Sequence, residues 1–222
     1  MGACLAVLVK FPRPGRVKSR LATDIGAEHA ADIQKGMLLD ILDRFCRIPN
    51  LVLAIVFPFD EKPHPFLDLC RHARIPSDRI LLLQGIGDMN KDIVHAHRTL
   101  LTRFRKVVMM GADIPHYAST QLGEMLSALD EVDIAYHPNP DDGCCPHGLR
   151  RFGDLWTGND SRDPGYILRW TELATAQSLS SRALSSIFDV DRLDDLVRLE
   201  NEFADHCPHT MRAIRALHAQ TR

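Results

Sequence analysis

The sequence lacks the long apolar stretch that a membrane span requires. A transmembrane helix needs about 20 consecutive apolar residues, whereas the apolar segment nearest the amino terminus spans only residues 3–9 and ends at Lys10. The same segment is too short for a secretory signal. We therefore expect a protein without a membrane span, located in the cytoplasm.

The sequence also carries little net charge. It contains 27 Lys and Arg residues against 29 Asp and Glu residues, which gives a formal net charge of −2. Proteins that bind nucleic acid generically are usually basic, so we expect no nucleic-acid partner, and any anion site must be local. Apolar residues make up 45% and charged residues 25% of the chain, a composition that excludes the collagen-like and disordered classes.

Zinc-binding and disulfide patterns are absent as well. The chain has six cysteines, but no CxxC pair and no HExxH motif occurs. A structural zinc site at residues 144–147 or 206–209 is therefore not expected. Without a secretory signal, we expect the cysteines to be reduced thiols.

What the sequence does have is a regular alternation of short apolar runs and helical patterns. Runs typical of buried strands lie at residues 3–9, 51–57, 80–83, 106–110 and 132–136. Apolar residues follow a helical period at residues 27–46, 89–104 and 119–129. This order predicts βαβ units, and hence an α/β fold with a parallel sheet and helices on both faces.

The alternation stops at residues 138–168, which are rich in Gly, Pro, Asp and Cys. Helical patterns return at residues 170–184 and after Asp191. The sequence contains no repeat and no linker, so we expect one domain over residues 1–222 with an irregular insertion at about 138–168. Ligands of open α/β sheets lie beyond the carboxyl ends of the strands, which directs attention to residues 10–20, 111–116 and 138–148.

Residues 10–20 read KFPRPGRVKSR and contain five cations and no acid. Gly15 allows the backbone to turn and to approach a ligand closely. Backbone N–H groups in such a loop form a concavity for anions, and Lys and Arg add positive charge. Neither GxxxxGKS/T nor GxGxxG is present. The segment predicts a phosphate site, and the alternative is a solvated basic loop.

Acidic residues follow the later strands. Asp113 lies in GADIP just past the strand at 106–110, where a divalent ion could bridge its carboxylate to phosphate oxygens. The alternative for Asp113 is a turn residue. Asp191 is at an expected N-cap position, and Asp194 three residues later completes a pattern that resembles a capping box. A capping side chain can also face a metal site. The acidic loop at 138–143 could be a plain turn.

Five segments, taken in order, resemble one family. They read VKFPRPGRVKSRL at 9–21, QGIGD at 84–88, GADIP at 111–115, PNPDDG at 138–143 with its continuation to Leu149, and DVDRLDDL at 189–196. Together they look like the small bacterial GT-A-type nucleotide-diphospho-sugar transferases, a glycosyltransferase-like group long known only as a domain of unknown function. The group is similar to the phospholactate guanylyltransferases. The resemblance covers about residues 4–200.

This resemblance implies a GT-A-like three-layer α/β/α sandwich with a mainly parallel sheet, and a requirement for Mg²⁺ or Mn²⁺. It implies that Asp113 and Asp191 hold the metal, and that Lys18, Arg20 and Asp113 are catalytic. Residues 141–143 (Asp141, Asp142 and Gly143) would form an acceptor-side loop. The nucleotide and its phosphates would be bound by Lys10, Gly15, Arg16, Lys18, Arg20, Gly87 and Asp88.

The activity that the resemblance implies is transfer of a glycosyl group from a nucleotide-diphospho-sugar to an unidentified acceptor. The metal and the basic loop would neutralise the leaving diphosphate. The alternatives are nucleotidyl transfer from a nucleoside triphosphate to a phosphorylated acceptor, and nucleotide binding without catalysis. The second alternative arises from a difference in one loop. The family has an Asp-Gly-Gly-Tyr-Tyr loop, whereas this chain reads DDGCC at 141–145 and so lacks the two aromatic residues.

Overall fold

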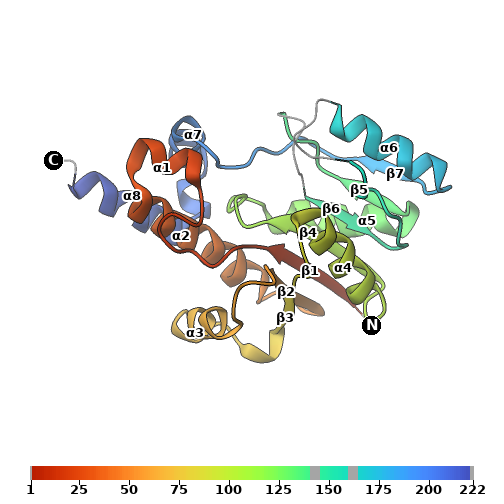
Figure 1. Ribbon diagram of the computed structural model, residues 1–222, viewed down its shortest axis with the longest axis horizontal. Helices are drawn as coiled ribbons and strands as arrows, with labels where there is room; N and C mark the ends of the chain where they lie inside the picture. Colours follow the sequence, from red (N-terminus) through yellow and green to blue (C-terminus); the bar gives the residue numbers. More distant parts are fainter. Residues whose placement is uncertain (1, 141–145, 160–164, 221–222) are drawn as a thin grey trace.

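A seven-stranded sheet forms the centre of the molecule (Figure 1). The computed structural model describes residues 2–140, 146–159 and 165–220. The sheet order is β3-β2-β1-β4-β6-β5-β7. The strands are β1 (Ala3–Leu8), β2 (Leu51–Phe57), β3 (Ile80–Gln84), β4 (Lys106–Gly111), β5 (Ile134–Tyr136), β6 (His147–Leu149) and β7 (Ser181–Ala183).

The sheet is mainly parallel, as the sequence predicts. The first four strands in the order pair in parallel, and so do β5 and β7. Only β6 runs antiparallel to its neighbours β4 and β5 among the described strands. β1 lies between β2 and β4, so the chain leaves β1 at the point where the sheet order switches direction. In α/β sheets this is the usual place of a ligand crevice.

Helices cover both faces of the sheet, which confirms the predicted three layers. The eight α-helices of the described chain are α1 (Ser19–Ile25), α2 (Ala27–Phe45), α3 (His64–His72), α4 (Met89–Leu101), α5 (Ser119–Glu131), α6 (Tyr166–Ala176), α7 (Leu193–Phe203) and α8 (Pro208–Gln220). Side chains of β1 alternate between the two faces. Leu5 and Val7 pack with α2, α3 and α5, while Cys4 and Ala6 pack with α4 and α6.

A third apolar cluster lies beyond the carboxyl end of β1. It joins α1, α2, α7 and α8, which gather at one end of the molecule (Figure 1). Leu21 of α1 is fully buried in this cluster together with Val190 and Leu196. The first loop of the chain is thereby packed against the segment that precedes α7, far away in the sequence.

The structure corrects the prediction of a helix at residues 170–184. Helix α6 ends at Ala176, Ser178 adopts a positive φ of 54°, and β7 follows. A left-handed residue stops a helix because the next N–H groups turn back onto its last carbonyls, and Leu179 N–H indeed donates to Ala174. The insertion at 138–168 contains β6, which short apolar runs do not reveal.

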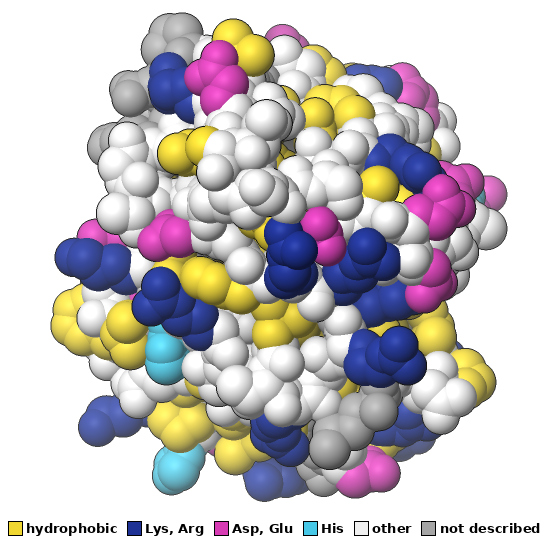
Figure 2. Space-filling model, turned by 90° about the vertical axis from the view of Figure 1, so that its right-hand side faces the viewer, with side chains coloured by type: hydrophobic (Ala, Val, Ile, Leu, Met, Phe, Trp, Pro, Cys, Tyr) yellow, Lys and Arg dark blue, Asp and Glu magenta, His cyan; other side chains and the backbone are white. Residues whose placement is uncertain are grey.

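The surface matches the balanced composition. On the face shown in Figure 2, Lys and Arg side chains lie beside Asp and Glu side chains, and hydrophobic side chains are scattered. The four cysteines of the described chain, Cys4, Cys46, Cys70 and Cys207, are buried free thiols. No helix among the described residues combines the length and hydropathy needed to cross a bilayer.

Candidate active site

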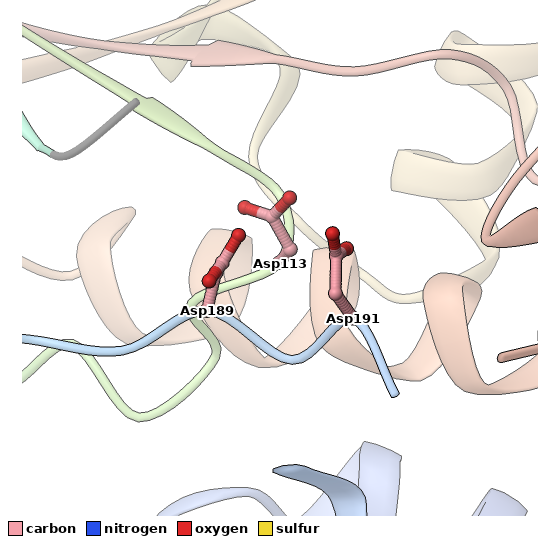
Figure 3. A group of neighbouring side chains, drawn as sticks. All are labelled: Asp113, Asp189 and Asp191. Atoms are coloured by element: carbon pink, nitrogen blue, oxygen red, sulfur yellow. The ribbon is translucent and has the colours of Figure 1, made fainter. Parts of the chain in front are cut away.

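Three carboxylates from two segments meet beside the sheet. Asp113 follows β4, whereas Asp189 and Asp191 lie in the segment between β7 and α7. The N–H of Val190 donates to the carbonyl oxygen of Asp113 over 2.9 Å and fastens the two segments together. One oxygen of each carboxylate lies within 4.8 Å of the others, and the side chains converge (Figure 3). We call Asp113, Asp189 and Asp191 the acidic triad.

The alternating pattern of residues 188–191 explains why two of these acids share one side. Phe188 and Val190 are buried in or beside the third apolar cluster, and the acids between and after them are half-buried. In an extended chain, successive side chains point to opposite sides. Burying the apolar pair therefore turns Asp189 and Asp191 toward Asp113.

Lys18 inserts its ammonium group into the acidic triad. Lys18 Nζ lies 2.6 Å from Asp191 Oδ1 and 3.3 Å from Asp113 Oδ2, and its side chain is only 6% exposed. The backbone of Lys18 is left-handed with φ 48°, and the residue forms the N-cap of α1. Arg20 approaches Asp191 from the solvent side, with Nη1 2.9 Å from Oδ2.

Neighbouring charges shift the pKa values of Asp191, Lys18 and Asp189. Burial opposes ionisation of Asp191, but Lys18 and Arg20 outweigh it and hold the pKa of Asp191 below its ordinary value. Burial also disfavours the charged form of Lys18, but Asp113 and Asp191 prevail and raise the pKa of Lys18. Burial, followed by the charges of Asp113 and Asp191, raises the pKa of Asp189. The group is thus a set of interacting, partly buried charges around a buried lysine.

The capping function predicted for Asp191 belongs to another residue. The N-cap of α7 is Arg192, and Asp195 accepts the N–H groups of Asp191 and Arg192 over 3.0 and 2.8 Å. The prediction was wrong by one position because two acids, Asp194 and Asp195, stand side by side. The side chain of Asp191 is left to face the two cations. Asp113 likewise pairs with Lys18 rather than acting as a plain turn residue.

The basic loop is fixed to the connection between β2 and α3. The N–H of Phe11 donates to Glu61, a buried carboxylate, over 2.7 Å. Arg16 pairs with Asp60 at 2.7 Å, and Gly15 takes a positive φ of 74° in the turn before it. Lys10 is exposed. The loop therefore presents cations from a defined backbone rather than from a free surface segment.

Residues 84–88 form the opposite wall of the same region. The buried carboxylate of Asp92 accepts the N–H groups of Ile86 and Gly87 over 2.6 and 3.0 Å. Asp88 caps α4 by accepting the N–H of Lys91, and it pairs with the Lys91 ammonium group. The N–H of Gly87 and the carboxylate of Asp88 are thus already engaged in hydrogen bonds within the chain.

A cleft of about 720 Å³ lies between these segments. That volume is within the usual range for small-molecule sites. Asp189, His147, Phe59 and Met89 contribute to its lining. The predicted site residues that line it are Lys10, Gly15, Arg16, Gly87, Asp88 and Asp113.

The remaining predicted residues adjoin the cleft or lie outside the described chain. Lys18 contacts Asp113, which lines the cleft, and Asp191 and Arg20 are joined to it through Lys18. Residues 141–143, the predicted acceptor-side loop of Asp141, Asp142 and Gly143, are outside the described residues.

Sequence reasoning missed three acids that shape the site: Asp189, Glu61 and Asp92. For Asp189 a signal exists, because two acids separated by one apolar residue in an extended segment must share a side. Asn139 supports it by donating to Asp189 Oδ1 over 2.8 Å. Glu61 accepts the N–H of Phe11, 50 positions away in the sequence, which no local pattern predicts. Asp92 accepts the N–H groups of the turn five and six residues before it.

A second hollow, of about 900 Å³, lies between α2, α3 and α8. Its size exceeds that of the cleft, but its charged lining residues include Asp32, Lys35 and Arg212, which are exposed on helix surfaces. No member of the acidic triad lines it. Buried, converging charges rather than volume therefore identify the candidate site.

Solved structures share this fold over nearly the whole chain. A nucleotide-diphospho-sugar transferase candidate from Desulfovibrio desulfuricans G20 has a TM-score of 0.84 at 24% identity, covering 99% of this chain and 98% of that chain. A cytidylyltransferase from Leptospira borgpetersenii has a TM-score of 0.55 at 12% identity, with coverage of 100% and 95%. Rv0371c of Mycobacterium tuberculosis H37Rv, in complex with manganese, has a TM-score of 0.52 at 17% identity, with coverage of 91% and 100%. These likenesses establish the fold as that of a nucleotide-diphospho-sugar transferase.

Sequence comparison gives a family without an assigned activity. No curated protein matches the chain. Residues 60–158, which include the β2–α3 connection, the 84–88 segment and Asp113, match the family described as "Uncharacterized protein conserved in bacteria (DUF2064)". The resemblance in the sequence to a family long known only as a domain of unknown function is thereby confirmed.

Proposed function

We propose that this protein is a transferase that acts on a nucleotide-diphospho-sugar and passes its glycosyl group to an acceptor. The observation that carries the proposal is the buried contact of Lys18 with Asp113 and Asp191 at the side of a cleft lined by the basic loop. The likeness to a nucleotide-diphospho-sugar transferase candidate over the whole chain supports it.

The acidic triad fits Mg²⁺ or Mn²⁺. Both ions prefer oxygen ligands and are commonly held by one or two carboxylates plus substrate oxygens. Asp113 and Asp191 would hold the ion, and Asp189, with an oxygen within 4.8 Å of theirs, offers a third ligand. One structural relative was solved with manganese. When bound, the ion supplies positive charge next to the diphosphate.

The chain's own cations would bind that diphosphate. Lys18 and Arg20 lie at the triad, while Arg16 and Lys10 lie along the cleft. Charge-assisted hydrogen bonds to phosphate are stronger than neutral ones. Because they face the place where negative charge develops as the sugar–phosphate bond breaks, these groups would stabilise the leaving diphosphate.

The far part of the cleft suits the rest of a nucleotide. Phe59 and Met89 line it and are unusually exposed for apolar side chains, at 60% and 44%. A flat base can cover such side chains while its phosphates meet the basic loop. We propose that Gly87 and Asp88, whose polar groups are engaged within the chain, form the wall against which the nucleotide lies.

A second candidate is nucleotidyl transfer, and the fold shared with a cytidylyltransferase over the whole chain favours it. The same cations would then hold a triphosphate while a phosphorylated acceptor attacks the α-phosphorus. In that reaction pyrophosphate leaves, and in glycosyl transfer a nucleoside diphosphate leaves.

Calorimetric titration with Mn²⁺ and UDP-, GDP- and ADP-sugars, set against the nucleoside triphosphates, tests the proposal. Tight binding of one nucleotide sugar, with release of its nucleoside diphosphate in the presence of acceptors, supports glycosyl transfer. Preferred triphosphate binding with pyrophosphate release on addition of phosphorylated acceptors supports the second candidate. Binding without turnover of any donor would show a nucleotide-binding protein, and no binding would refute both reactions.

A further inference from the structure

The ammonium group of Lys18 lies where an ion would have to bind. Its Nζ makes hydrogen bonds of 2.6 Å to Asp191 and 3.3 Å to Asp113. These two carboxylates belong to the acidic triad, whose oxygens lie within 4.8 Å of one another. A Mg²⁺ ion bound by them would lie at about 2.0–2.1 Å from each ligand oxygen. An ion that bridged the two oxygens bound by Lys18 would therefore compete with the ammonium group for them.

We propose that Lys18 and the divalent ion exclude each other. Lys18 closes the acidic triad in the metal-free protein, and entry of the ion releases its ammonium group into the cleft, where it can bind the diphosphate. The inference rests on the proposed metal site. It adds an order of events to that site. The ion binds first, and its binding frees Lys18 to bind the diphosphate.

The charges of the site favour such an exchange. Lys18 and Arg20 together offset two of the three carboxylates. A divalent ion in place of Lys18, with Arg20 retained, offsets all three. The exchange therefore improves the neutralisation of the carboxylates and leaves one cation free for an anionic ligand.

The local structure allows the side chain to move without the backbone. The carbonyl of Lys18 accepts the N–H of Ala22 in the first turn of α1, and Leu21 anchors that turn in the third apolar cluster. Lys18 itself has a left-handed backbone, with φ 48°, and a side chain that is 6% exposed. A lysine has a flexible four-carbon stem, so rotation of its side chain is sufficient to withdraw the ammonium group.

Titration of the full-length protein with Mn²⁺ alone, with free ion followed by electron paramagnetic resonance, tests the proposal. Lys18→Gln keeps a hydrogen-bonding side chain but removes the competing charge. We expect this variant to bind Mn²⁺ at least about tenfold more tightly than the wild type, the factor that loss of one charge-assisted hydrogen bond implies. Lys35→Gln, an exposed lysine of α2 outside the cleft, should bind Mn²⁺ as the wild type does. Equal or weaker binding by Lys18→Gln would overturn the exchange.

Lysine acetylation of the wild type, read by mass spectrometry, provides a test that needs no variant. We expect Mn²⁺ to raise the labelling of buried Lys18 severalfold and to leave exposed Lys35 unchanged. Unchanged labelling of Lys18 in protein that binds Mn²⁺ would overturn the exchange while leaving the proposed metal site intact. If neither the wild type nor Lys18→Gln binds Mn²⁺, the metal site fails, and the exchange fails with it.

Discussion

Lys18 Nζ lies 2.6 Å from Asp191 Oδ1, although the two residues are 173 positions apart in the chain. The fold creates this contact by packing Leu21 of α1 against Val190 in one apolar cluster. Arg20, in the first turn of α1, reaches the second oxygen of Asp191. The amino-terminal loop and the segment before α7 thus form one charged site, on which the following predictions depend.

Replacing Asp113 by Asn should abolish Mn²⁺-dependent nucleotide binding and leave the melting temperature nearly unchanged. The amide is a poor ligand for the ion, whereas the half-exposed side chain contributes little packing. Calorimetry with Mn²⁺ and a nucleoside diphosphate measures the loss. Asp32→Asn is a matched control, because it makes the same change at an exposed acid of α2 outside the cleft. Metal-dependent affinity that survives in Asp113→Asn would mean that Asp113 holds no ion.

Replacing Lys18 by Ala should weaken nucleoside diphosphate binding at saturating Mn²⁺. The expected loss is about 1.5–3 kcal/mol, the contribution of a hydrogen bond to a charged group. Saturating metal separates this effect from the competition between Lys18 and the ion. Lys35→Ala, an exposed change in α2, should leave the affinity unaltered. An unchanged affinity in Lys18→Ala would place the phosphates elsewhere.

Replacing Asp92 by Ala should destabilise the fold and loosen the wall of the cleft. The change leaves the part-buried N–H groups of Ile86 and Gly87 without their acceptor, and a lost hydrogen bond of this kind costs about 0.5–1.5 kcal/mol. Urea denaturation measures the free energy of unfolding. Asp92→Asn retains one acceptor oxygen and should lose less. Equal stability of the wild type and Asp92→Ala would show that the carboxylate does not hold the 84–88 segment.

Stability should fall in mild acid partly because of His116. The ring stacks on Phe188 and also contacts Phe203, and burial, followed by the charges of Arg198 and Arg44, lowers the pKa of His116 to about 4. In the unfolded chain His takes a proton near pH 6.5. The unfolded state therefore binds more protons between these values, so the free energy of unfolding falls as the pH falls from about 6.5 to about 4.

The slope of this loss has an upper limit of about 1.4 kcal/mol per pH unit for one histidine. His116→Phe keeps the aromatic packing but removes the titration. Urea denaturation at pH 7 and pH 5 should therefore show a smaller loss for the variant than for the wild type. Buried His97, whose pKa is also lowered by burial, contributes equally to both proteins. Parallel losses would show that His116 is protonated in the folded state.

The sequence predicts those strands and helices whose apolar residues follow a regular local pattern. The strands near residues 3–9, 51–57 and 106–110 are apolar runs buried on both faces, and the structure has them almost as expected. The short helix α1 and the strand β7 lack such patterns. Packing against neighbouring elements stabilises them, so their own sequences do not predict them. A left-handed residue at Ser178, which no propensity suggests, separates α6 from β7.

The candidate site was predictable where residues follow strand ends. Asp113 and the basic loop both lie at carboxyl ends of parallel strands, so the topology alone brings them to one edge. Asp191 required the resemblance to a family, since it lies in an irregular segment. The contact of Glu61 with the N–H of Phe11, 50 positions away, depends on tertiary geometry and leaves no trace in the local sequence.

The most direct test of the account is a crystal structure of the protein with Mn²⁺ and a nucleoside diphosphate. We predict an anomalous peak for the ion between Asp113 and Asp191, with the diphosphate against residues 10–20 and the Lys18 ammonium group on a phosphate oxygen. A nucleotide bound in the hollow between α2, α3 and α8, or an acidic triad that still holds Lys18 and no ion at saturating Mn²⁺, would contradict it.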